Sequence, residues 1–289
     1  MEDRKRWGDR RDARWIRDVD GLHAIMPHLM NKRTDSEVYI NQEFDVTELM
    51  AFLNERNVSE TGDRTKFFHC IIMAVARLIQ LRPDLNIYIS GRRMYRRHRT
   101  SMAFVARRDF SDGSRESLII TEVDDDWTLR KVTDEITGTV REVRTSDSYG
   151  VDKTMDMLSR IPRVLLMAMA GVVRILDFYG KTPRSLTRGD PNFCTVLLSN
   201  LGSIRCSSVY HHLNNYGTNS IVVTIGTVHN REVLYDDGTK QVRRMVDVGI
   251  TMDERIADGM YFARSMKVLQ QILSEPELLD IPMRDPIEL

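Results

Sequence analysis

Two strand-like segments joined by an acidic turn are the feature that most constrains how this chain folds. Residues 232–235 and 241–252 carry β-branched, aliphatic and aromatic side chains, and an Asp-Asp-Gly turn at 236–238 separates them. An Asp-Gly pair between two such segments is a strong hairpin signal, because the tight turn needs residues that tolerate positive φ. We therefore predict an antiparallel hairpin here, and the strand-like segments 195–200 and 220–228 place it in a larger sheet.

The rest of the chain alternates between strand-like and helix-like segments, which is the pattern of an α/β domain. The strongest helix signal is the apolar segment 66–80, which ends before Pro83 because proline cannot continue a helix. Asp45, with Glu48 three residues later, marks the start of a helix over 46–57. Further helices are predicted over 127–145 and 258–274, and further strands over 37–44, 86–90, 101–107 and 118–123.

Neither a repeat nor a low-complexity linker divides the 289 residues, so we predict a charged N-terminal arm over 1–20 and a single domain over 21–289. Within that domain, the Met- and Leu-rich segment 152–180 predicts a helical hairpin insertion. Its apolar centre, Val164–Val173, is about half of the ~20 residues that a membrane-spanning helix needs. We therefore expect no transmembrane span and a buried segment. An amphipathic element that lies on a membrane or a partner is the alternative.

Charge and cysteine content argue against several classes of function. Lys plus Arg and Asp plus Glu both number 42, so no overall field favours nucleic acid as a partner. The basic run Gly91–Arg99 is expected to be a solvated turn, with phosphate contact as the alternative. Three cysteines without a CxxC pair argue against a zinc site and for a reducing compartment, and we expect Cys194 and Cys206 to be buried structural thiols. The charged N-terminus predicts no signal peptide and a cytoplasmic location.

Two ordered motifs point to a known family. The first is Val196–Ile204 (VLLSNLGSI), and the second is Asp253–Gly259 (DERIADG), which a predicted helix follows. Together they resemble the catalytic domain of the dihydrolipoyl acyltransferases of 2-oxoacid dehydrogenase complexes, which share a superfamily with chloramphenicol acetyltransferase. Weaker matches in the same order extend the resemblance over roughly residues 20–282. The resemblance implies an α/β fold of the chloramphenicol acetyltransferase-like, CoA-dependent type, with a mixed β-sheet flanked by helices.

The resemblance also implies a chemistry, the transfer of an acyl group between coenzyme A and an acceptor. Such a transfer needs a base for a thiol whose pKa is about 8.5, and a donor for the oxyanion of the tetrahedral intermediate. Ser199 matches the family's oxyanion donor, and Asp258 matches the aspartate of its second motif. The family's basic histidine has no match, because Glu254 stands at its position.

Two interpretations of Glu254 are open. A solvated glutamate has a pKa about two units below that of histidine and is a poor base for a thiol. Glu254 is therefore either a base retuned by burial or a structural residue in an ion pair, and we expect the structural role. His211 and His212 are the alternative bases, because in relatives the equivalent segment lines the substrate channel; the other interpretation is that they only bind loop backbone. The chain also resembles a lipoyl-free, single-domain subgroup in which glutamate at this position is the normal state.

The resemblance implies partners as well. We expect coenzyme A, as acyl-CoA, to be a substrate, and we expect no metal. A homotrimer is predicted because the relatives build their active site between chains, and assembly of trimers into a larger cage stays open. No lipoyl domain or flexible Ala/Pro linker is recognised in this sequence, so we expect a partner to supply the acyl or lipoyl carrier. The alternative function is a non-catalytic trimeric scaffold or a module that binds a CoA-like ligand.

Overall fold

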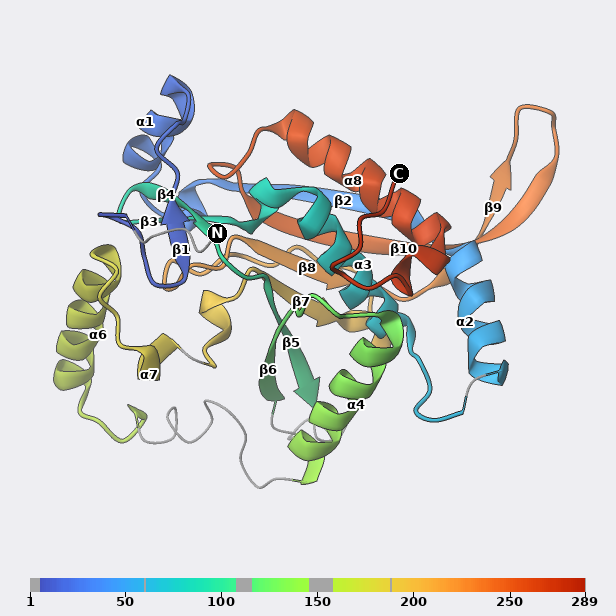
Figure 1. Cartoon of the computed structure of the whole chain (residues 1–289), viewed down its shortest axis with the longest axis horizontal. Helices are drawn as coiled ribbons and strands as arrows, with labels where there is room; N and C mark the ends of the chain where they lie inside the picture. Colours follow the sequence, from blue (N-terminus) through green and yellow to red (C-terminus); the bar gives the residue numbers. More distant parts are fainter. Residues whose placement is uncertain (1–5, 60, 108–115, 146–157, 188, 289) are drawn as a thin grey trace.

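The computed structural model describes residues 6–59, 61–107, 116–145, 158–187 and 189–288, which form a large mixed sheet, a small sheet and surrounding helices (Figure 1). The large sheet has seven strands, and helices pack against one of its faces. The small sheet has three strands and includes part of the N-terminal arm. Most of the hydrophobic core lies between the large sheet and its helices.

The large sheet has the order β2-β10-β8-β7-β5-β6, with β9 paired to β10. β7 runs parallel to β5 and to β8, and the other neighbours are antiparallel. The predicted hairpin is confirmed as β9 and β10, and Gly238 in its turn has φ of 80°. The strands are β2 (Glu37–Asp45), β5 (Ser101–Arg107), β6 (Glu116–Glu122), β7 (Val196–Asn200), β8 (Ile221–Ile225), β9 (His229–Leu234) and β10 (Lys240–Asp253).

Four predicted helices are confirmed within about two residues at each end. The apolar segment becomes α3, which is buried over most of its length, and the C-terminal helix is α8. Asp45 marks the start of α2 as expected, because its carboxylate accepts a hydrogen bond of 2.9 Å from the Thr47 amide. The helices are α1 (Gly21–Leu29), α2 (Thr47–Ser59), α3 (Phe67–Leu81), α4 (Leu129–Thr145), α6 (Arg163–Phe178), α7 (Arg184–Thr187) and α8 (Gly259–Ser274).

Alternation along the central strands gives the sheet two unlike faces. In β10, Val246, Val248, Ile250 and Met252 all belong to the core under the helices. Successive strand side chains point to opposite faces, so the intervening positions of β10 and the matching positions of β8 and β7 lie on the second face. Leu197 and Val222 lie on this face, but the other positions on it are small or polar, and they include Ser199, Thr224, Gly249, Thr251 and Asp253. A polar face on a central sheet is where a site can be built.

The small sheet corrects the prediction of a basic turn over Gly91–Arg99. Most of that run is a strand, β4 (Arg93–Arg97), which lies between β1 (Ala13–Trp15) and β3 (Ile87–Ser90). Only Gly91 and Arg92 make the turn, and both have positive φ. The run forms a strand because Tyr95 is buried and stacks on Tyr88, while the arginines are paired or cover aromatic rings.

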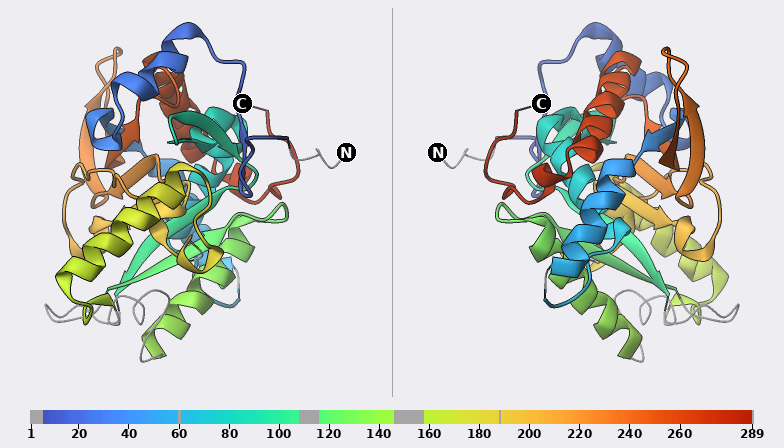
Figure 2. Two further views of the ribbon diagram at one scale, coloured as in Figure 1. Left: turned by 90° about the vertical axis from the view of Figure 1, so that its left-hand side faces the viewer. Right: turned by 90° about the vertical axis from the view of Figure 1, so that its right-hand side faces the viewer.

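The prediction that the Met- and Leu-rich segment is buried is wrong for its described part. The segment forms α6, and none of its residues is buried. The N-terminal portion of the predicted hairpin, residues 152–157, lies outside the described residues. In the described parts of the chain, every helix is too short or too polar to cross a lipid bilayer. Figure 2 shows α6 and α1 on the same side of the molecule.

Candidate active site

Ser199 lies at the C-terminal end of β7, one residue before the strand ends. Its partner in register on β8 is Thr224, which in turn pairs with Gly249 on β10. The Ser-Asn-Leu-Gly motif that follows is a tight turn: the Asn200 side chain accepts a hydrogen bond of 3.3 Å from the Ser203 amide. A Cβ at Gly202 would lie only 2.5 Å from the Gly226 carbonyl oxygen. The motif therefore holds Ser199, half-buried, at the edge of the polar face.

The segment after this turn, the loop Cys206–Gly217, crosses the polar face of the sheet. The Val209 amide donates to the Thr224 hydroxyl at 3.2 Å, and that hydroxyl also contacts the Val209 carbonyl oxygen. A Cβ at Gly249 would collide with the same carbonyl oxygen. Gly249 is thus required because the loop backbone lies directly on β10.

His211 and His212 lie in this loop, exposed and stacked, with ring centroids 4.8 Å apart. The Nδ1 atom of His211 is 2.9 Å from the His212 carbonyl oxygen, and that of His212 is 3.1 Å from the Leu213 carbonyl oxygen. A carbonyl oxygen only accepts, so in the neutral ring the proton sits on Nδ1 and the lone pair on Nε2. Each histidine therefore binds loop backbone through Nδ1, and this contact leaves the Nε2 lone pair available, so the role of the pair as a base stays a prediction.

The end of the loop is anchored to the start of β2. The Leu213 amide donates to the Glu37 carboxylate at 2.5 Å, and Arg33 donates to the Asn214 carbonyl oxygen at 3.2 Å. Arg33 is buried, and burial lowers the pKa of its guanidinium to about 10, so it stays a cation at neutral pH. These contacts fix the position of the two histidines relative to the end of β10, where Asp253 pairs in register with Glu37.

Glu254 follows β10 directly and is half-buried. Its amide donates to the Ser36 carbonyl oxygen at 2.9 Å, while its carboxylate makes no hydrogen bond or ion pair within the described residues. The neighbouring Arg255 binds Asp253, through Nε to Oδ1 at 2.8 Å and Nη2 to Oδ2 at 2.6 Å, and both side chains are buried. The ion pair expected for Glu254 is thus absent from the described structure, because Asp253 takes the adjacent cation in a bidentate geometry.

Asp258 is exposed and acts as the N-cap of α8. Its carboxylate accepts a hydrogen bond of 2.7 Å from the Tyr261 amide, which is one of the free donors of the first helical turn. Gly259 begins the helix. Asp258 therefore shapes the turn that carries Glu254 into α8.

The structure brings some of the predicted residues together and separates others. His212 and Glu254 both lie beside the start of β2, through Leu213–Glu37 on one side and Ser36 on the other. Ser199 is aligned across the strands with Thr224 on β8 and Gly249 on β10. Gly249 lies five residues before Glu254. At ~3.3 Å per residue this is a separation of about 16 Å along the sheet. Within one chain, Ser199 and Glu254 therefore belong to opposite ends of the polar face.

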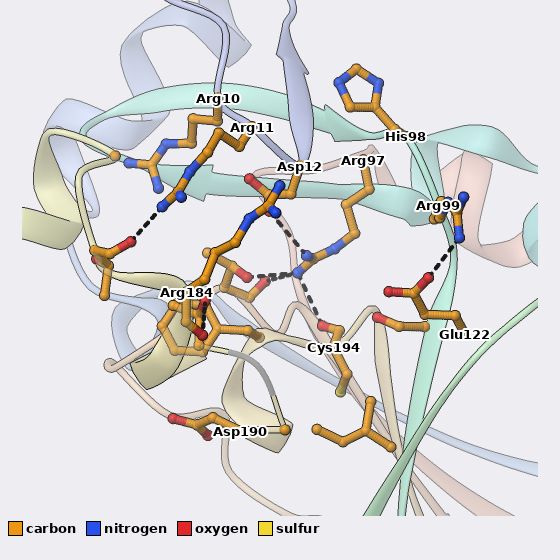
Figure 3. A pocket seen from close by; sticks show the side chains of 18 of the residues that line it. Arg10, Arg11, Asp12, Arg97, His98, Arg99, Glu122, Arg184, Asp190 and Cys194 are labelled. Carbon is orange, nitrogen blue, oxygen red and sulfur yellow. Dashed lines mark hydrogen bonds and ion pairs between the residues drawn. The ribbon is translucent and has the colours of Figure 1, made fainter.

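A cavity of about 940 Å³ that no sequence motif predicted lies beside the small sheet and is lined in part by arginines (Figure 3). Arg97, from β4, is buried and donates to the carbonyl oxygens of Cys194 at 3.0 Å and Thr218 at 2.9 Å. Arg10 and Arg11 come from the arm, so the alternation of Arg and Asp there was the only available signal. Acidic residues also line the cavity, and the cations are largely engaged by protein groups: Arg97 with Asp12, Arg99 with Glu122, and Arg10 with Asp177.

Of the two cysteines that were expected to be buried, one is buried and one is exposed. Cys194 lines this cavity and is buried as expected, and burial raises the pKa of its thiol to about 12, so it is not a nucleophile at neutral pH. The expectation of burial is wrong for Cys206, which is exposed where the loop leaves the motif turn. Among the described residues, His, Cys, Asp and Glu side chains form no group that could hold a metal ion.

The sequence of this chain is similar to known acyltransferases. The family model described as 2-oxoacid dehydrogenases acyltransferase (catalytic domain) matches residues 182–281. The lipoamide acyltransferase component of the branched-chain alpha-keto acid dehydrogenase complex of Bacillus subtilis (strain 168) is 22% identical over 263 residues. The match covers 88% of this chain and 51% of that protein, so the chain spans about half the length of this curated relative.

Solved structures share the fold. A probable dihydrolipoamide acetyltransferase from Listeria monocytogenes 4b F2365 has a TM-score of 0.61 at 17% identity, covering 89% of this chain and 93% of that chain. The cubic core of a pyruvate dehydrogenase multienzyme complex also has a TM-score of 0.61 at 17% identity, covering 92% and 94%. A chloramphenicol acetyltransferase has a TM-score of 0.56 at 11% identity, covering 90% and 99%. The predicted fold class and the predicted resemblance are thereby confirmed.

Proposed function

We propose that this chain is a domain of the 2-oxoacid dehydrogenase acyltransferase type and that it moves an acyl group between coenzyme A and an acceptor. One observation carries the proposal. Ser199 lies on the polar face of the central sheet, and the loop Cys206–Gly217 that crosses this face carries two histidines whose Nε2 atoms have no hydrogen-bond partner among the described residues. A nitrogen base and a hydroxyl donor are the two groups that thiol-dependent acyl transfer requires.

The proposed reaction assigns a role to each of these groups. His211 or His212 takes the proton of the CoA thiol at Nε2, and the thiolate attacks the acyl carbonyl carbon. The new carbon–sulfur bond forms while the carbonyl oxygen becomes an oxyanion, to which the Ser199 hydroxyl donates. In this direction the acyl group starts on the second substrate, called the acceptor above, and moves to CoA. Collapse of the intermediate breaks the bond between the acyl carbon and the atom of that second substrate, which takes the proton from the imidazolium.

The proposal gives Glu254 and Asp258 supporting roles. Glu254 has no cation beside its carboxylate in the described structure, since Arg255 is bound to Asp253. We assign Glu254 a structural role at the end of β10, where its amide donates to the Ser36 carbonyl oxygen, and Asp258 the role of holding the turn through its helix cap. A glutamate that served as the base would need a large rise in its pKa to match a thiol at neutral pH, whereas imidazole needs none.

We further propose that the working unit is a homotrimer. Ser199 and Glu254 lie at opposite ends of the polar face in one chain, so a site that uses both ends needs residues from a second copy. The structural likeness to a cubic multienzyme core is in keeping with assembly. Assembly of trimers into a larger cage and a partner that supplies the acyl or lipoyl carrier are part of the same proposal.

The alternative is a non-catalytic trimeric scaffold or a module that binds a CoA-like ligand. The replacement of the family histidine by Glu254 favours it. Two measurements separate the proposals: calorimetric titration with CoA, and release of CoA from acetyl-CoA with dihydrolipoamide as a trial acceptor. The enzyme proposal predicts both binding and release. If CoA binds but is not released from acetyl-CoA with this or other thiol or amine acceptors, the chain is a binding module. If CoA neither binds nor is released, the chain is a scaffold.

A further inference from the structure

Helix α6 exposes an apolar face that no other part of the described structure covers. Four of its aliphatic side chains are largely open to solvent: Val164 at 81%, Met167 at 64%, Val172 at 56% and Ile175 at 61%. At 100° per residue these four positions fall on one face of the helix. Exposed apolar area of this extent is uncommon on a monomer and marks a surface that contacts something else.

The attachment of α6 to the rest of the chain is polar. The carboxylate of Asp177 lies 3.7 Å from the Arg10 guanidinium, and Arg10 also donates to the Asp177 carbonyl oxygen at 2.6 Å. The Ser90 hydroxyl also donates to the Asp177 carbonyl oxygen, at 3.4 Å. Polar contacts at the end of α6 therefore attach the helix, and its apolar side chains face the solvent.

The charged side chains of the segment that carries α6 are mostly basic. Residues 158–187 contain five basic side chains and one acidic side chain, Asp177, which Arg10 already engages. The chain as a whole has equal numbers of basic and acidic residues, so this bias is local. Arg163 and Arg174 lie eleven residues apart and border the same edge of the apolar face, because eleven residues make about three turns. Phe178 and Tyr179 follow, both exposed.

From this arrangement we infer that α6 docks onto an anionic lipid surface. An outward apolar stripe edged by arginines, with exposed aromatic side chains at its end, is the pattern of a helix that lies in the headgroup region of a bilayer. The helix has 16 residues and is about 24 Å long, which is shorter than the ~30 Å hydrocarbon core, so it lies along the surface. The cations require a negatively charged surface beside the apolar one.

A second copy of the chain is the competing occupant. A two-fold contact of α6 against α6 is disfavoured, because it places the same patch on both sides and brings the like charges Arg163 and Arg174 together. The contact of a trimer joins two different patches, and the test below separates it from membrane docking. The inference is independent of the proposed acyl transfer, because none of the residues it uses lines the polar face of the sheet.

The test is co-flotation of the full chain with vesicles. Vesicles of phosphatidylcholine mixed with phosphatidylglycerol are compared with vesicles of phosphatidylcholine alone. We expect binding to the anionic vesicles, and we expect release when the salt is raised to about 1 M, where the screening length falls to ~3 Å. Binding of the double variant Val172→Glu, Ile175→Glu should fall by roughly tenfold or more, since two charges then replace apolar contacts.

Val58→Glu is the matched control, because Val58 is also an exposed aliphatic residue on a helix, at the far end of α2. It should bind anionic vesicles as the unaltered chain does. Circular dichroism and solution mass are measured for every variant. Absence of binding by the unaltered chain, or equal loss in Val58→Glu, overturns the inference. If the unaltered chain does not bind vesicles and the double variant has a different solution mass from the unaltered chain, α6 is a contact between copies instead.

Discussion

The Ser199 hydroxyl is not engaged in holding the described fold together, so its proposed catalytic role can be tested separately from stability. This hydroxyl is half-buried at the end of β7 and makes no hydrogen bond within the described residues. We predict that Ser199→Ala lowers the rate of acyl transfer by roughly 10²–10³-fold, which is the usual effect of removing one oxyanion donor, and leaves the free energy of unfolding nearly unchanged. Steady-state kinetics and urea unfolding measure the two effects. Ser274→Ala, at the exposed end of α8, is the control, and an unchanged rate in folded Ser199→Ala would remove Ser199 from the mechanism.

The identity of the base is a second question at this scale. If a histidine is the base, His211→Ala or His212→Ala lowers the rate by about 10²-fold or more, while Glu254→Gln keeps most of the activity. The rates of all three variants are compared at saturating acetyl-CoA, with CoA affinity measured separately so that lost binding is not mistaken for lost chemistry. The reverse pattern, together with a gain of activity in Glu254→His, would make Glu254 the base.

At the scale of elements, the sequence predicted most strands and helices because their signals are local. The β9–β10 hairpin follows from its Asp-Gly turn, and α3 follows from a nearly continuous apolar segment. The strand β4 was missed because three of its five residues are arginines, and the carbonyl oxygens that satisfy buried Arg97 come from residues far along the chain. Apolar composition likewise predicted burial for α6, but whether an apolar helix is covered depends on long-range packing that the sequence does not display.

Helix α3 also predicts a pH dependence of stability. His69 is buried in its first turn, and burial, with Lys66 nearby, lowers the pKa of its imidazole to about 4. In the unfolded chain that pKa is about 6.5, so between these values the unfolded state binds a proton that the folded state does not, and stability falls as the pH is lowered. At pH 5 the His69 contribution to this loss is about 2 kcal/mol.

Urea unfolding at pH 7 and pH 5 measures this effect. His69→Gln should remove that part of the pH dependence, because glutamine does not titrate, while His28→Gln, at an exposed position on α1, should keep it. Equal pH dependence in His69→Gln and in the unaltered chain would show that His69 does not set it.

At the scale of the whole molecule, the fold determines how far apart the two sequence motifs lie. The sequence identified Ser199 and the Asp253–Gly259 motif by resemblance, but it did not show that they lie at opposite ends of one face, since that follows from the register of β7, β8 and β10. We predict that the chain is a homotrimer in solution, because only a second copy brings the two ends together. Light scattering coupled to gel filtration measures the mass, and a monomer at micromolar concentration would contradict the prediction.

The most direct test of the proposed function is a crystal structure of the chain with CoA. We predict that the CoA sulfur lies on the polar face of the sheet, within about 3–3.5 Å of Nε2 of His211 or His212, the range of near-attack contacts. We also predict that a Ser199 hydroxyl, from the same or a neighbouring copy, points to where the acyl oxygen would be. CoA bound elsewhere, or a sulfur nearest the Glu254 carboxylate with both histidines remote, would contradict it.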